Sequence, residues 1–264
     1  MEVFPYSWNT YEENGCIGIR VFGLNKNNEN VFILINDFKP YVYLELPPLP
    51  LGMSWEESVS KLNNVSSVID RIMGKSKPVK KILQFKKKLY YAKKDVIDQK
   101  YIDKVYPFLK CYFNSFTDLK NCSFRFKKPV RLSDLGEVMI KVHESDANPI
   151  LQFMCMKNIK PSSWFKFAGK KITNEIEKLT TCTHEYETSY QNFIPIDNNN
   201  VTKPYIMSFD IEVNSSNPNV APQFGVPEDK IFQISCVFCR NGDSENNYEK
   251  YFIDISRIVS SNRM

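Results

Sequence analysis

Segments of strand length, either alternating or continuously apolar, recur along this chain of 264 residues. Segments of this kind predict β-strands. They are residues 16–24 (CIGIRVFGL), 31–35, 39–46, 88–93, 108–113, 164–167, 205–213 (YIMSFDIEV), 230–239 and 248–253. The polar stretch 197–203 (DNNNVTK) interrupts this series before the last three segments. We therefore expect one domain over residues 1–200 and a second over residues 204–264.

The first three segments follow one another closely, and the Asn-rich turn at residues 25–30 joins the first two. This spacing predicts a hairpin that extends into a three-stranded meander. Helix signals follow: Ser54 and Glu57 have the spacing of a capping box, and Asn148-Pro149 combines a cap with a favoured first residue. The expected helices are residues 54–73, 115–121, 133–138 and 149–159. The chain is therefore expected to be an α+β protein.

Composition excludes several classes of protein. Hydrophobic residues make up 42% of the chain, which is enough to form a core and argues against disorder. No run of about 18 apolar residues is present, and the N-terminus lacks the pattern of a secretory signal. The seven cysteines are odd in number and irregularly spaced, which indicates reduced thiols and an intracellular protein.

Positive charge is concentrated in one segment, although the net charge is only +5. Residues 75–94 contain nine lysines and no acidic residue, with Phe85, Tyr90 and Tyr91 between them. Lysines can neutralise phosphates while aromatic rings stack on bases, and such contacts are independent of base sequence. The segment is equally compatible with a solvated surface held by a few core residues.

Asp210 and Glu212 are two residues apart in an apolar strand, so both side chains are expected on the same face. Paired carboxylates are the oxygen ligands that Mg²⁺ and Mn²⁺ prefer, and a two-metal site can activate a water and stabilise a leaving oxygen. This pattern indicates phosphodiester hydrolysis. The alternative is an exposed Asp and Glu without a function, since the short motif by itself arises by chance.

Three patches of the chain together resemble one protein family. Residues 208–212 (SFDIE), followed by residues 224–235 (FGVPEDKIFQIS), resemble the first exonuclease motif of delta-type B-family DNA polymerases. Residues 144–164 and residues 38–47 (FKPYVYLELP) are similar to two earlier stretches of the same family, in the same order. Departures are Gln152, where the family usually has Arg, and an altered order of residues in the loop at 222–227. The resemblance is to polymerases of eukaryotes and their large DNA viruses.

This resemblance implies an N-terminal piece of a replicative polymerase, with a mixed N-terminal domain before the first three strands of an RNase H-like 3′→5′ exonuclease sheet. It implies Asp210 and Glu212 as ligands of Mg²⁺ or Mn²⁺. The expected partners are DNA (single-stranded template and primer 3′ end), the remainder of the polymerase in cis or in trans, and a sliding clamp. The expected location is the nucleus or a viral replication site. We expect Lys86, Lys87, Lys88 and Tyr90 to contact the template.

The family's second and third exonuclease motifs and its polymerase Asp-Thr-Asp site do not occur before Met264. We therefore expect the 264-residue chain to have neither polymerase nor nuclease activity alone, and residues 204–264 to be less stable than residues 1–200. Two alternatives stay open. One is a non-catalytic nucleic-acid-binding module derived from the polymerase N-terminal fold, and the other is an unrelated interaction protein with a chance motif.

Other candidate sites are weaker. Cys236 and Cys239 form a CxxC on a predicted strand, where they would face opposite sides, and no second pair is present to complete a zinc site. His143 and His184 are the only histidines. We expect ordinary thiols and hydrogen-bonded or surface imidazoles at these positions.

Overall fold

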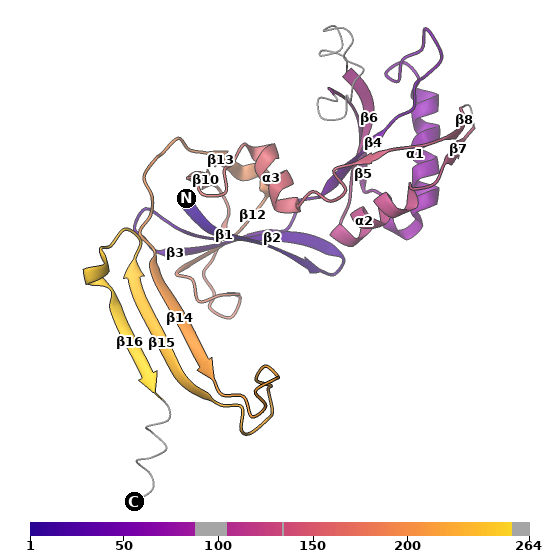
Figure 1. Ribbon diagram of the computed structural model, residues 1–264. Coiled ribbons are helices and arrows are strands. Elements are labelled where there is room, and N and C mark those ends of the chain that lie inside the picture. Colours follow the sequence, from indigo (N-terminus) through magenta and orange to yellow (C-terminus); the bar gives the residue numbers. More distant parts are fainter. Residues whose placement is uncertain (88–104, 134, 255–264) are drawn as a thin grey trace, which may run out of the picture. The chain divides into compact units, whose positions relative to one another are not determined.

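The computed structural model describes residues 1–87, 105–133 and 135–254 (Figure 1). It divides into two compact units, the first formed by Met1–Asn25 and Glu29–Asn198, and the second by Lys26–Asn28 and the chain from Asn199 onward. The mixture of strands and helices confirms the α+β class. The division falls in the polar stretch 197–203, and the assignment of the units to polymerase domains stays a prediction.

The first unit begins with a curled seven-stranded sheet in the order β11-β12-β3-β2-β1-β10-β13. All neighbours are antiparallel except β12 and β3, which are parallel. The strands are β1 (Glu2–Glu13), β2 (Cys16–Leu24), β3 (Asn30–Ile35), β10 (Phe165–Phe167), β11 (Lys170–Ile172), β12 (His184–Thr188) and β13 (Phe193–Pro195). Helix α3 (Pro149–Lys157) packs Phe153 and Met154 into the core that this sheet forms.

A second sheet of the same unit has the order β5-β6-β4-β9, and every pair in it is antiparallel. Its strands are β4 (Tyr41–Glu45), β5 (Lys80–Lys87), β6 (Val105–Tyr112) and β9 (Val142–His143). Helices α1 (Val59–Met73) and α2 (Phe116–Arg125) share one core with Val42, Leu44, Leu109 and Cys111 of the sheet. Along the chain the elements run β4-α1-β5-β6-α2-β9, with a hairpin of β7 (Val130–Leu132) and β8 (Gly136–Val138) between α2 and β9.

The second unit contains a three-stranded antiparallel sheet of β14 (Tyr205–Val213), β15 (Ile231–Arg240) and β16 (Glu249–Asp254). Short 3₁₀ turns lie at Gly74–Ser76, Tyr190–Asn192 and Glu245–Asn247. The predicted strands at residues 205–213, 230–239 and 248–253 are confirmed to within one residue at each end.

Local sequence explains two of the helices. The Ser115 side chain accepts a hydrogen bond from the Asp118 backbone N–H at 3.0 Å at the start of α2. The Asn148 side chain accepts one from Ile150 N–H at 2.8 Å at the start of α3, where Pro149 is the first helical residue. These caps satisfy backbone donors that have no partner within the helix, as the sequence predicted for α3.

Three expectations are wrong. The chain does not open with a meander, because β1 precedes the β2–β3 hairpin and β4 pairs with β6 and β9 in the other sheet. Helix α1 begins at Val59 rather than at Ser54, whose hydroxyl accepts a hydrogen bond from Glu57 N–H within a turn. In the helix expected at residues 133–138, the described residues are not helical, since Gly136, at φ +72°, begins β8 of a hairpin.

Candidate metal site and nucleic-acid contacts

Asp210 and Glu212 lie on the same face of β14 (residues in orange in Figure 1), as their spacing predicts. Residues paired directly across an antiparallel sheet also share a face. Ser235 pairs with Asp210, and Gln233 pairs with Glu212. On the next strand, Asp254 pairs with Gln233. This face therefore presents three carboxylates together with a hydroxyl and an amide.

The opposite face of the same sheet is apolar. Phe209 pairs with Cys236, and Ile211 pairs with Ile234. Phe238 stacks on Tyr205 with ring centroids 5.8 Å apart, and it meets Tyr251 edge-on at 5.7 Å. None of the residues of β14, β15 or β16 is buried, and the whole of β14 is exposed.

Both carboxylates of the Asp210–Glu212 pair are solvated. Asp210 Oδ1 accepts a hydrogen bond from Ile211 N–H at 3.0 Å, and both side chains lie on an exposed strand. Within residues 1–87, 105–133 and 135–254, no group of three or more His, Cys, Asp or Glu side chains is arranged to hold a metal ion. The donor chemistry of Asp210 and Glu212 suits Mg²⁺ or Mn²⁺, but further ligands are needed for a metal centre.

The loop that follows Glu212 is organised by Asp229. Its carboxylate accepts hydrogen bonds from Ser216 N–H and Gln223 N–H, both at 2.7 Å. These two backbone donors hold the pKa of the Asp229 carboxyl below its ordinary value, because they stabilise the ionised form. Asp229 lies within the stretch 224–235 that resembles the exonuclease motif, where the sequence assigned it no role, and the loop contacts supply one.

Of the four predicted template contacts, the structure describes two, Lys86 and Lys87, on β5. Lys86 is exposed on β5, and its Nζ donates a hydrogen bond to the Tyr43 hydroxyl at 2.6 Å. Lys87 is the last residue of β5. Lys88 and Tyr90, together with the strand expected at residues 88–93, lie outside the described residues.

The sequence did not single out an aromatic cluster on the face of the β5-β6-β4-β9 sheet that bears Lys86. Tyr41, Tyr43 and Phe108 are buried there, and the Nζ of the buried Lys110 lies 3.5 Å from the centroid of the Tyr41 ring. Desolvation, aided by the nearby charge of Lys86, lowers the pKa of Lys110 to about 8. The cluster could have been predicted from the alternating aromatic residues of two strands, which are Tyr41 and Tyr43 on β4 and Tyr106, Phe108 and Tyr112 on β6.

Comparison with known proteins argues against an unrelated protein with a chance motif. Residues 140–264 match the family model described as DNA polymerase family B, exonuclease domain. The chain is 34% identical over 267 residues to DNA polymerase 120R of Invertebrate iridescent virus 3, and 28% identical over 258 residues to the DNA polymerase delta catalytic subunit of Plasmodium falciparum.

This chain is related to the family B DNA polymerases. The two alignments cover 96% and 92% of the chain, and 23% and 22% of the relatives, so the chain spans less than a quarter of the length of these curated relatives. The solved family B DNA polymerase of the archaeon Pyrobaculum calidifontis shares the fold, with a TM-score of 0.64 at 16% identity over 96% of this chain and 26% of that one. The resemblance drawn from the three sequence patches is confirmed.

Cys236 and Cys239 are free thiols three residues apart on β15, so they face opposite sides. His143 Nε2 lies 3.0 Å from Glu45 Oε2, and His184 Nε2 lies 3.0 Å from Glu29 Oε2. None of the helices in the described ranges is long and apolar enough to span a bilayer.

Proposed function

We propose that this chain is the N-terminal part of a DNA-directed DNA polymerase with a proofreading 3′→5′ exonuclease, and that it is inactive by itself. In this proposal residues 1–200 form the polymerase N-terminal domain. Residues 204–264 supply the beginning of an RNase H-like exonuclease domain. The similarity to B-family exonuclease domains over residues 140–264 supports this assignment.

One observation carries the proposal. The sheet that bears Asp210 and Glu212 has an apolar face on which Phe209 is 57% exposed and Ile211 is 39% exposed. Stable domains bury such a face against a second layer of secondary structure. The remainder of the nuclease domain, supplied in cis or in trans, would cover this face and bring the missing carboxylates to the acidic one.

In the completed site, Asp210 and Glu212 would be metal ligands, and both already project from one face of β14. Mg²⁺ or Mn²⁺ held there would activate a water for attack on the terminal phosphodiester and stabilise the leaving oxygen. Asp229 would keep the adjacent loop in place through Ser216 and Gln223. The primer 3′ end is the expected substrate, and the template strand would contact the lysine segment that includes Lys86, Lys87, Lys88 and Tyr90.

Two measurements test this proposal. The first is the DNA sequence downstream of codon 264, where we expect a reading frame, continuous or separate, that encodes the second and third exonuclease motifs and a polymerase palm. Unrelated sequence there would refute the proposal. The second is incubation of the purified chain with Mg²⁺ and a 5′-labelled oligonucleotide, where we expect no shortening. Shortening that Asp210→Ala abolishes would show that the chain is a complete nuclease.

A further inference from the structure

The β5-β6-β4-β9 sheet has two chemically different faces. One face, with Leu44 and Leu109, packs against α1 and α2 in a hydrophobic core. The chain order β4-α1-β5-β6-α2-β9 and the sheet order place β6 and β4 in the middle of the sheet. Four-stranded sheets backed by helices in this way can bind single strands by stacking two or three bases on aromatic residues of the other face.

Aromatic residues occupy that other face along both central strands. Tyr41 and Tyr43 come from β4, and Tyr106, Phe108 and Tyr112 come from β6. Their rings touch in sequence, with centroids 5.7 Å apart for Tyr41 and Tyr112 and 6.2 Å apart for Tyr43 and Phe108. The central rings are buried, whereas Tyr106 and Tyr112 at the two ends of the row are partly exposed. The buried rings therefore hold the two outer rings in place.

Lysines lie on the same rings. Lys110 Nζ is 3.5 Å from the Tyr41 centroid and 5.0 Å from the Tyr112 centroid. Lys86 Nζ is 3.9 Å from the Tyr43 centroid. Lys110 is buried and stabilises the inner rings, whereas Lys86 is exposed. The partly exposed outer rings and Lys86 therefore offer the two contacts that single-stranded nucleic acids need, which are base stacking and phosphate neutralisation.

A cavity of about 210 Å³ adjoins one end of the row. Tyr112 and Tyr190 contribute rings to its wall, and Lys39 and Lys80 contribute cations. Asp37 also lines it, but its carboxylate already accepts hydrogen bonds from Ser189 Oγ and Tyr190 N–H. The cavity is therefore suited to an aromatic group that carries negative charge.

We propose that this face binds single-stranded nucleic acid, with bases stacked on Tyr106 and Tyr112, phosphates on Lys86 and Lys80, and one nucleotide in the cavity beside Tyr112. The inference rests on the proposed function, whose DNA-binding role it assigns to a defined surface. It shares Lys86 with the contacts expected for the lysine segment, and it differs from them in placing the stacked bases on Tyr106 and Tyr112 of β6. DNA and RNA share the chemistry that this face would recognise.

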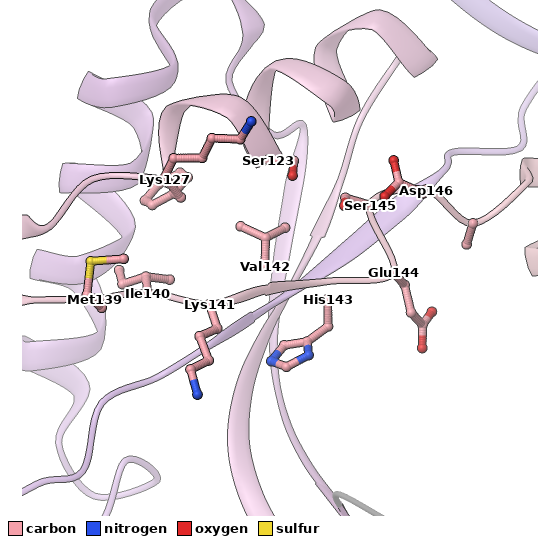
Figure 2. A pocket seen from close by; sticks show the side chains of 12 residues that line it. Ser123, Lys127, Met139, Ile140, Lys141, Val142, His143, Glu144, Ser145 and Asp146 are labelled. Carbon is pink, nitrogen blue, oxygen red and sulfur yellow. The ribbon is translucent and has the colours of Figure 1, made fainter. Parts of the chain in front are cut away.

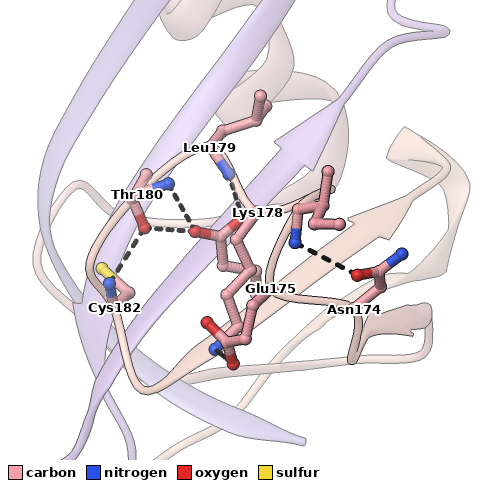
Figure 3. A network of polar contacts seen from close by, with 8 residues as sticks. Asn174, Glu175, Lys178, Leu179, Thr180 and Cys182 are labelled. Carbon is pink, nitrogen blue, oxygen red and sulfur yellow. Dashed lines mark hydrogen bonds and ion pairs between the residues drawn. The ribbon is translucent and has the colours of Figure 1, made fainter.

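Another pocket and a polar network of the first unit do not indicate a ligand. The open pocket formed with Ser123, Lys127, Lys141 and His143 (Figure 2) presents both acidic and basic groups and points to no single ligand. In the network of Figure 3, the Glu185 carboxylate accepts hydrogen bonds from Leu179 N–H and Thr180 N–H, which orders the loop before β12. Its donors and acceptors satisfy one another within the chain.

The test is fluorescence anisotropy with the full 264-residue chain and labelled dT12 or rU12 at low salt. We expect Tyr106→Ala and Tyr112→Ala each to weaken binding about tenfold, since stacking contributes on this scale per base. Tyr→Phe at both positions should retain affinity, which separates loss of a ring from loss of structure. We expect Lys86→Ala to reduce the salt dependence. Phe124→Ala and Lys120→Ala, on exposed positions of α2, are the matched controls.

Binding of both dT12 and rU12 supports recognition of bases and phosphates common to DNA and RNA. Binding of only one of them identifies whether the ligand of this face is DNA or RNA. Unchanged affinity in Tyr106→Ala and Tyr112→Ala would overturn the inference. Loss of affinity only in Lys87→Ala/Lys88→Ala would do the same while supporting the template contacts of the proposed function. If the unmodified chain binds neither oligonucleotide, the inference falls, whereas the downstream reading frame still decides whether the chain is part of a polymerase.

Discussion

Loss of one phenyl ring should destabilise the first unit much more than the second, because the ring is buried in the first and exposed in the second. Phe165 is fully buried in the first unit, with ring centroids 5.9 Å from Trp8 and 5.2 Å from Phe193. Phe→Ala at such a position destabilises by roughly 3–5 kcal/mol. Phe209 on β14 is 57% exposed. Since full burial of a Phe side chain contributes roughly 1.5–3 kcal/mol, its loss should change stability by about 1 kcal/mol or less.

Hydrogen–deuterium exchange read by mass spectrometry resolves the two units in one experiment. In the unmodified chain, we expect amides of β14, β15 and β16 to exchange faster than those of β2 and β3. Phe165→Ala should accelerate exchange throughout the first unit. Phe209→Ala should leave the first unit unchanged and have little effect on its own sheet.

Equal destabilisation by Phe165→Ala and Phe209→Ala would refute this reasoning. It would show that the apolar face of β14 is covered within the chain itself. Uniformly high protection across both units would have the same meaning. In either case the exposed sheet would no longer argue for a missing second layer.

Three further predictions follow from single contacts. Because backbone donors lower its pKa, the ionised Asp229 carboxylate should hold the loop at residues 214–228 in place above the ordinary carboxyl pKa, and the loop should lose its order as the pH falls through the lowered pKa. Amide exchange of the loop measured as a function of pH, with Asp229→Asn for comparison, tests this. NMR should give Lys110 a pKa of about 8. Between this pKa and the ordinary value of 10.5 the unfolded chain binds more protons than the folded chain, so the stability of the first unit should increase as the pH rises through this window, and it should increase less in Lys110→Met. Ser115→Ala should destabilise the first unit by about 1 kcal/mol in urea unfolding, whereas Ser58→Ala, at an N-cap without a side-chain hydrogen bond, should have a much smaller effect.

Sequence alone located the elements with strong local signals. Strands β2 and β14 have the predicted bounds, because their apolar patterns are uninterrupted and turns flank them. Helix α3 begins where Asn148-Pro149 places it. The shared face of Asp210 and Glu212 also followed from strand periodicity alone.

Elements that depend on distant pairing were missed. Strand β1 contains Pro5 and several polar residues, and it is held by its register with β2 and β10 rather than by its own pattern. The strand at 39–46 was expected beside its sequence neighbours, but β4 lies between β6 and β9. For the same reason the position of Lys110 among the rings of β4 and β6 could not be derived from either strand alone.

The most direct test of the central claim is reconstitution of the nuclease. The chain is combined with the polypeptide encoded downstream of codon 264, and release of nucleotides from the 3′ end of a 5′-labelled single strand is followed with Mg²⁺. We predict activity that requires both parts and is lost in Asp210→Ala and Glu212→Ala but retained in Glu245→Gln, an acidic control in the turn before β16. Activity that persists in Asp210→Ala and Glu212→Ala would contradict the assignment of these two residues as metal ligands.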